Sequence, residues 1–229
     1  MKRFSLICII ALAFAAIYPS TGFAAANTLP PLLDKALKEA EAQSDLRVSY
    51  TMTFLWPGEE EIVSRYDAKL KNWSLISGNP KALSRKARNK YNKFKRIESV
   101  PGGLVYADYR SSIKSAIQVE ENSDEIAFSF TSPQTPSDIE DLSDNVRTRL
   151  IVDRRDNSMS EYSIHALKPF SRGPALSMDE FSYVHTFERV FEDTPPLMTK
   201  AYCNAKGRRF FSAIDEEYTL LFSDFQKVM

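Results

Sequence analysis

Two histidines, His165 and His185, are the only imidazole side chains in this chain of 229 residues. Either could act as the general base of a hydrolase with a serine nucleophile, and together they could share a metal ion if carboxylates folded beside them. The sequence contains no glycine-rich phosphate loop, nucleophile elbow, His-Glu-x-x-His or Cys-x-x-Cys. A hydrolase built on either histidine stays an alternative. The sequence favours structural roles for both and assigns no catalytic residue, no metal and no cofactor.

A second group of candidates is a run of basic side chains between residues 81 and 96. It holds eight Lys and Arg residues, and the first acidic residue after it is Glu98. Three interpretations are open: a solvated surface facing the acidic stretch 120–144, a contact with lipid headgroups, or a docking face for an acidic partner protein. The candidate contact residues are Arg85, Lys86, Arg88, Lys90 and Lys93.

Aromatic side chains are the third group, with fifteen Phe, ten Tyr and two Trp. Many of them fall at alternate positions of strand-like segments, so they are expected to share one side of a sheet. That side is either a filled core or the lining of a cavity for an acyl chain. The candidate ligand-binding residues are Tyr50, Met52, Phe54, Trp56, Phe128, Phe130, Phe181, Tyr183 and Phe187, and Phe210 and Phe222 are expected on the same side.

The element that best positions these side chains is the segment 47–56, RVSYTMTFLW. Its alternation of large apolar and small polar residues predicts a long, half-buried strand. Further strands are predicted at 61–68, 73–76, 116–120, 125–131, 147–153, 159–167, 176–190, 198–205, 208–213 and 217–227, with a tight turn at Lys206-Gly207 between two of them.

Helices are predicted at both ends of the first three strands. One starts at Asn27–Pro31 and continues to residue 43, with an apolar stripe that should dock on the strand 47–56. A second, basic helix spans about 80–96, and a short third one is expected near 107–113. The predicted fold is therefore α+β: a strongly curved antiparallel sheet, an open half-barrel of about 10–11 strands, packed on two or three helices.

The N-terminal 26 residues have the features of a cleaved signal peptide: a basic start, an apolar run of about fourteen residues and a small-residue end at Ala24–Ala26. Residues 27–229 should then form a single periplasmic α+β domain with no transmembrane segment. Cleavage removes Cys8 and leaves Cys203 as the one cysteine, expected in the core. The near balance of acidic and basic residues, together with export, disfavours nucleic acid as a partner.

Several short motifs resemble those of a group of uncharacterised exported bacterial proteins. The motifs are Arg65-Tyr66-Asp67-Ala68, Asn72-Trp73-Ser74-Leu75, Phe170, Phe181, Phe187, Phe210-Phe211 and Ser223-Asp224-Phe225. In layout the chain is also similar to the periplasmic lipoprotein carriers (LolA/LolB-like), which fold as an open barrel around a helical lid. The resemblance implies a Gram-negative periplasm and an apolar concave face that takes acyl chains, and the basic insertion 79–96 departs from it.

The expected function is therefore that of a non-enzymatic periplasmic protein that binds a lipid or lipoprotein acyl chain on its concave aromatic side. One alternative is an envelope scaffold or protein-interaction module that uses the basic helix 80–96 or a sheet edge to bind another envelope protein.

Overall fold

In a computed structural model, the described residues are 29–41, 46–95, 117–130, 145–172 and 175–228. They form two helices, α2 (Pro31–Glu41) and α3 (Arg85–Phe94), and eleven strands. The strands are β1 (Val48–Leu55), β2 (Ile62–Asp67), β3 (Asn72–Ser77), β4 (Ile117–Glu121), β5 (Glu125–Phe130), β6 (Val146–Asp153), β7 (Ser158–Ala166), β8 (Phe170–Arg172), β9 (Leu176–Glu188), β10 (Leu197–Arg209) and β11 (Ser212–Lys227).

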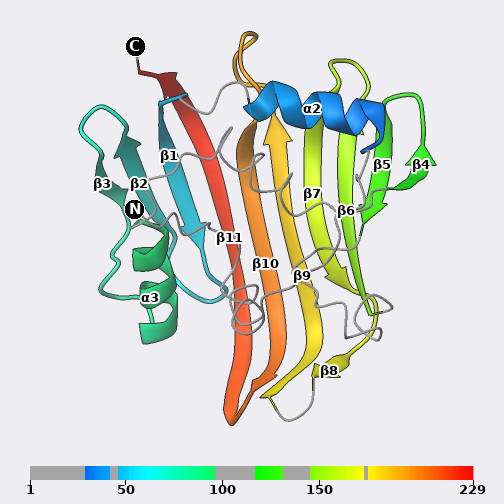
Figure 1. The fold of residues 1–229 in the computed structure, drawn as a ribbon. Coiled ribbons are helices and arrows are strands. Elements are labelled where there is room, and N and C mark those ends of the chain that lie inside the picture. Colours follow the sequence, from blue (N-terminus) through cyan, green and yellow to red (C-terminus); the bar gives the residue numbers. More distant parts are fainter. Residues whose placement is uncertain (1–28, 42–45, 96–116, 131–144, 173–174, 229) are drawn as a thin grey trace, which may run out of the picture.

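All strands belong to one antiparallel sheet (Figure 1). Ten of them follow the order β3-β2-β1-β11-β10-β9-β7-β6-β5-β4, and β8 pairs with β9 beside this path. The sheet is open, with β3 and β4 as its two edges. The segment between β3 and β4 therefore joins opposite edges, which explains why the sequence places its one long insertion there. The prediction of a mainly antiparallel sheet with helices is confirmed.

One row of paired residues shows which side of the sheet is buried. Because residues directly opposite each other in an antiparallel ladder point to the same face, the pairing can be followed from strand to strand. The row runs from β2 to β5 through Ile62, Phe54, Leu220, Ala201, His185, Tyr162, Leu150 and Phe128. Every member is buried. We call this side the aromatic face, and the sequence prediction that alternate apolar residues share one side is confirmed.

The opposite side, the polar face, carries shorter and charged side chains. Its neighbouring row includes Thr219, Tyr202 and Arg149. Ion pairs join strands on this face: Arg149 of β6 binds Glu120 of β4 across β5, and Lys206 of β10 binds Glu180 of the neighbouring β9 at 2.9 Å. The two faces therefore differ in composition from one edge of the sheet to the other.

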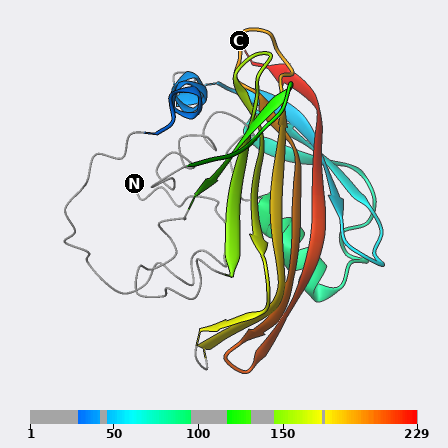
Figure 2. The same cartoon turned by 90° about the vertical axis from the view of Figure 1, so that its right-hand side faces the viewer.

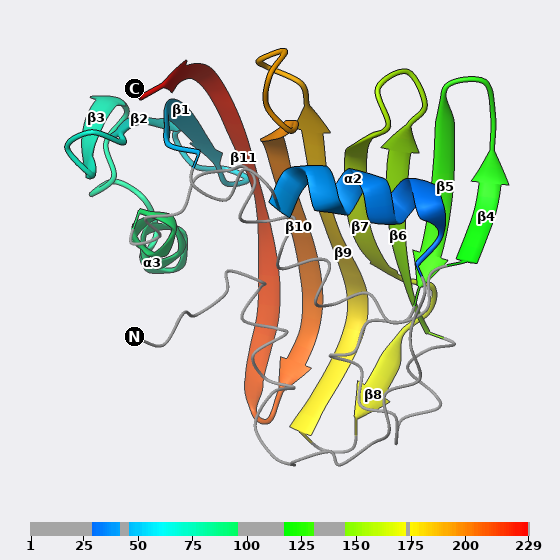
Figure 3. The ribbon, with the colours of Figure 1, turned by 45° about the horizontal axis from the view of Figure 1, so that its top comes forward.

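Helix α2 crosses several strands on the aromatic face, near one end of the sheet (Figures 1 and 3). Leu33, Ala36 and Leu37 are buried in the hydrophobic core, whereas Leu32 of the predicted stripe is exposed. The helix contacts β6 and β7. The expectation that it docks on the strand that follows it was wrong, because an apolar stripe can bury itself equally well on any strand that shares the aromatic face.

Helix α3 lies against the part of the aromatic face formed by β1, β2 and β11. The buried Tyr91 hydroxyl is 2.7 Å from Ser64 Oγ of β2, and the Phe94 ring lies tilted against Tyr218 of β11, with the ring centroids 5.2 Å apart. The helix starts later than predicted because the Ser84 side chain caps it, accepting a hydrogen bond from the Ala87 backbone N–H at 3.3 Å.

Two strand boundaries differ from the prediction. Lys206-Gly207 lies inside β10, and the chain turns at Phe210-Phe211, so the predicted strands 208–213 and 217–227 are divided between the end of β10 and a single long β11. Phe210 was predicted on the aromatic face and is instead exposed at this turn. Strand β8 was missed because it has three residues and no alternating pattern.

Some predictions fall on residues that the structure does not describe. These are the signal peptide, the capping candidates at 27–28, the short helix at 107–113, and the loop and acidic residues at 131–144. Neither helix in the described ranges combines the length and apolar composition that a membrane-spanning helix needs.

Candidate ligand-binding face

The rings of the aromatic face form two groups. The first surrounds β1, where Tyr50 contacts Tyr66, Trp73 and Phe222 with centroid distances of 5.4 to 5.7 Å. Its other members lie towards α3: Phe54 is 5.8 Å from Tyr91, and Trp56 stacks on Tyr218 at 6.4 Å. Burial and the neighbouring Tyr66 raise the pKa of Tyr50 well above its ordinary value, so this hydroxyl stays protonated.

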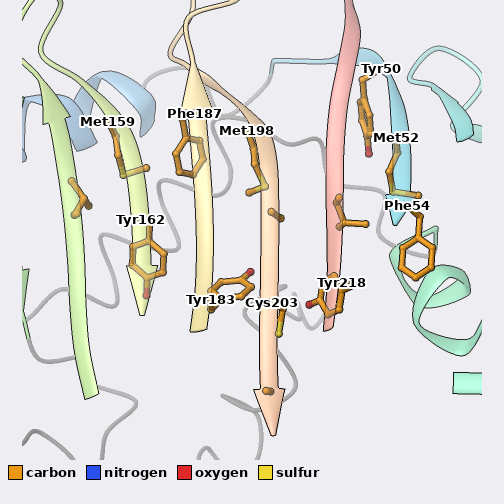
Figure 4. Packing of buried hydrophobic residues seen from close by; sticks show 14 of the residues in the cluster. Tyr50, Met52, Phe54, Met159, Tyr162, Tyr183, Phe187, Met198, Cys203 and Tyr218 are labelled. Atoms are coloured by element: carbon orange, nitrogen blue, oxygen red, sulfur yellow. The ribbon is translucent and has the colours of Figure 1, made fainter. Parts of the chain in front are cut away.

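The second group centres on β9. The His185 ring lies 4.3 Å from Tyr183 in an edge-on arrangement, and Phe187 and Tyr162 follow at 6.2 and 6.4 Å. Sulfur-containing side chains of Met159 and Met198 lie at the same end of the strands (Figure 4). Long, polarizable methionines adapt to irregular neighbours, so this end of the face can fit an apolar group of variable shape.

Strand β10 separates the two groups and carries small side chains there. Ala201, Cys203 and Ala205 lie on the aromatic face, where Cys203 pairs with Tyr218 on one side and Tyr183 on the other (Figure 4). The result is a strip of small residues flanked by rings. Cys203 is buried within it, which confirms its expected place in the core, and it forms no disulfide with any residue that the structure describes.

The structure brings eight of the nine candidate ligand-binding residues onto the aromatic face. Buried ones are Tyr50, Met52, Phe54, Phe128, Tyr183 and Phe187, and Trp56 and Phe181 are partly buried and packed against the same core. Phe130 ends β5, and its side chain lies outside the described part of the structure. The small residues of β10 were missed as site residues, although their alternation at 201, 203 and 205 was visible in the sequence.

The two histidines point to opposite faces of the sheet, which excludes a metal ion shared between them. His185 is buried among rings on the aromatic face, and His165 lies on the polar face, with its Nδ1 3.0 Å from Ser182 Oγ. The pKa of His165 lies below its ordinary value, chiefly because of burial. The charge of Glu161 opposes this shift, and the charge of Arg149 adds to it. Within the described residues, no group of three or more His, Cys, Asp or Glu side chains could hold a metal ion.

The Ser182–His165 pair places a hydroxyl beside an imidazole, an arrangement that hydrolase chemistry could use. In the described part of the chain, however, no carboxylate accepts a hydrogen bond from the other ring nitrogen. Without such a bond, the ring lacks the group that orients a catalytic histidine. The pair therefore resembles a cross-strand hydrogen bond that stabilises the sheet.

His185 makes stability depend on pH. Its burial lowers the pKa to about 3, from an ordinary value near 6.5. Between these values the unfolded chain binds a proton that the native imidazole does not, so the free energy of unfolding should fall as the pH falls, by at most about 1.4 kcal/mol per pH unit. Urea unfolding at pH 7, 6, 5 and 4 should show a shallower pH dependence for His185→Gln than for the unmodified protein.

His165→Gln is the matched control, because this ring is only half buried. It should change the pH dependence much less than His185→Gln does. Equal slopes for the unmodified protein and His185→Gln would contradict the prediction, whatever the absolute stability of the variant.

Two of the basic side chains of α3, Lys86 and Lys90, bind residues of β11. Lys90 forms an ion pair with Glu216 and lies 4.9 Å above the Tyr218 ring, and Lys86 donates a hydrogen bond to the Asp215 carbonyl. Arg88 donates to the Lys81 carbonyl at 3.4 Å, Lys93 is half buried, and Arg85 is exposed. In the acidic stretch, Glu120 and Glu121 bind Arg149 and Arg154 instead.

No protein-family model matches this chain, and none of the curated proteins matches it.

Proposed function

We propose that this chain is a non-enzymatic, exported protein of the bacterial envelope that binds an apolar ligand, the acyl chain of a lipid or lipoprotein, on the aromatic face. In this proposal the sheet curves as an open half-barrel around the ligand, the helices cover its aromatic side, and the mature protein works in the periplasm. The observation that supports it best is the single row of buried residues, all apolar or aromatic except His185, that runs from β2 to β5.

The strip of small side chains on β10 suggests where such a ligand would lie. The strip runs along β10 and consists of Ala201, Cys203 and Ala205. The rings of Tyr218 on β11 and Tyr183 on β9 flank it. An acyl chain placed along β10 would contact rings on both sides. Phe181 pairs with Ala205 and is only partly buried, so its ring is available to contact a bound chain.

The protein purified from the host envelope should carry a lipid that native mass spectrometry detects and solvent extraction releases. After delipidation, a long-chain fatty acid below its critical micelle concentration should raise the melting temperature. Phe181→Ser should weaken fatty-acid binding about tenfold, since it removes a ring from the contact. Leu70→Ser is the matched control, because Leu70 is 66% exposed in the turn between β2 and β3 and the variant should bind as the unmodified protein does.

The proposal fails if the protein is empty as purified and gains nothing in melting temperature from fatty acids. It also fails if Phe181→Ser, shown by circular dichroism to be folded, binds the fatty acid as tightly as Leu70→Ser does.

A further inference from the structure

The turn between β10 and β11 exposes two neighbouring aromatic rings. Phe210 is 62% exposed and Phe211 is fully exposed, whereas the other rings whose burial the structure describes are buried or partly buried. The turn lies at the tip of a long hairpin that projects at the end of the sheet opposite α2 (Figures 1 and 2). Because both rings are already exposed at this projecting tip, they can contact another molecule or surface without any change in the rest of the fold.

The backbone holds this tip in a defined shape. Phe210 has a φ of 52°, a left-handed conformation that bulky side chains rarely adopt. Its N–H donates a hydrogen bond to the Ala175 carbonyl at 2.9 Å, which ties the turn to the chain just before β9. The rings are therefore presented by an anchored turn rather than by a loose loop.

Positive charge flanks the two rings. Arg208 and Arg209 precede them and are exposed, and no acidic residue occurs between Lys206 and Asp215. Of the nearby carboxylates, Glu180 binds Lys206 and Glu216 binds Lys90, whereas Asp179 and Asp215 form no ion pair with any described residue. Within the described residues, neither guanidinium takes part in an ion pair or hydrogen bond. Two unpaired guanidinium groups thus lie directly beside two exposed rings.

We propose that this tip, residues 208–211, binds an anionic phospholipid surface. Guanidinium groups bind phosphate oxygens in a bidentate manner, and aromatic rings insert at the level of the headgroups. The combination of both at one projecting point matches the chemistry of a membrane interface, whose phosphates and acyl carbons lie within a few ångströms of each other. This inference is independent of the ligand proposed for the aromatic face.

Flotation with phosphatidylglycerol vesicles and with phosphatidylcholine vesicles tests it on the protein purified from the host envelope. Binding should be strong on the anionic vesicles, weak on the zwitterionic ones, and reduced by salt. The variant with Phe210→Asn and Phe211→Ser should bind about tenfold more weakly, and Arg208→Gln with Arg209→Gln should lose about fivefold per arginine. In a Phe211→Trp variant, the fluorescence emission should shift to the blue on adding anionic vesicles.

The matched control is Leu75→Ser with Ile76→Ser on edge strand β3, whose side chains are 50% and 57% exposed. It removes a similar apolar pair elsewhere and should leave vesicle binding unchanged. The proposal is overturned if the unmodified protein does not float with anionic vesicles, or if the tip variant floats as well as the control. It is also overturned if the tip variant alters only the sedimentation of the free protein, since the tip would then join two copies of the chain.

Discussion

Replacing Phe54 with Asp is expected to lower the free energy of unfolding by about 4 kcal/mol or more. Phe54 is fully buried, pairs with Ile62 and Leu220, and lies within 6.4 Å of the rings of Trp56, Tyr91 and Phe94. A carboxylate there would lose its hydration without gaining a partner, and the lost ring would weaken the contact between α3 and the sheet. Urea unfolding followed by circular dichroism measures the effect.

Thr53→Asp is the control for this substitution. Thr53 is the adjacent residue of β1, so its side chain points to the polar face, where it is half buried. We expect it to cost about 1 kcal/mol or less. If both variants unfolded at the same urea concentration, the assignment of the two faces would be wrong.

Replacing Gly207 with Ala should lower the free energy of unfolding by about 2 kcal/mol or more, because a methyl group has no room between β10 and β9. A Cβ atom at this position would lie 2.1 Å from the Ser177 carbonyl oxygen and 2.9 Å from the Met178 Cα atom. Both are backbone atoms of the paired strand, so they can move aside only if the ladder shifts. Thermal unfolding and urea midpoints should both decrease.

Gly58→Ala is the comparison that isolates this steric effect. A Cβ atom at Gly58 would meet nothing within 4 Å, and the substitution would carry only the cost of its φ of +75°, about 1 kcal/mol. A Gly207→Ala variant no less stable than Gly58→Ala would contradict the close approach of β9 and β10 at this point.

Gly207 also shows why one turn was misplaced. In the sequence, Lys206-Gly207 resembles a two-residue hairpin turn between apolar segments. In the structure this glycine instead lets two strands approach closely at a register shift. Both situations require a residue without a side chain, and residue type alone does not separate them. The aromatic pair that forms the real turn has no sequence signal of a turn.

The candidate face was largely predictable, whereas the partners of its residues were not. Alternation in β1 and β9 identified which side chains share a side, because successive residues of a strand point in opposite directions whatever lies beside them. Nothing local indicated that His185 would face Tyr162 or that His165 would lie beside Ser182. Those contacts depend on the register between strands that are separated in the sequence.

The amino-acid sequence by itself determined most of the strands, their two faces and most of the residues that each face carries, since side-chain period and apolar patterning are properties of short segments. Only the tertiary structure decided that β1 pairs with β11, that α2 packs on β6 and β7, and that Phe210 and Phe211 project from a hairpin tip. The physical reason is that burial of apolar area has no direction. Each apolar face has to be covered, but many segments could cover it equally well. The pairing of all strands in the sheet determines which segment does so.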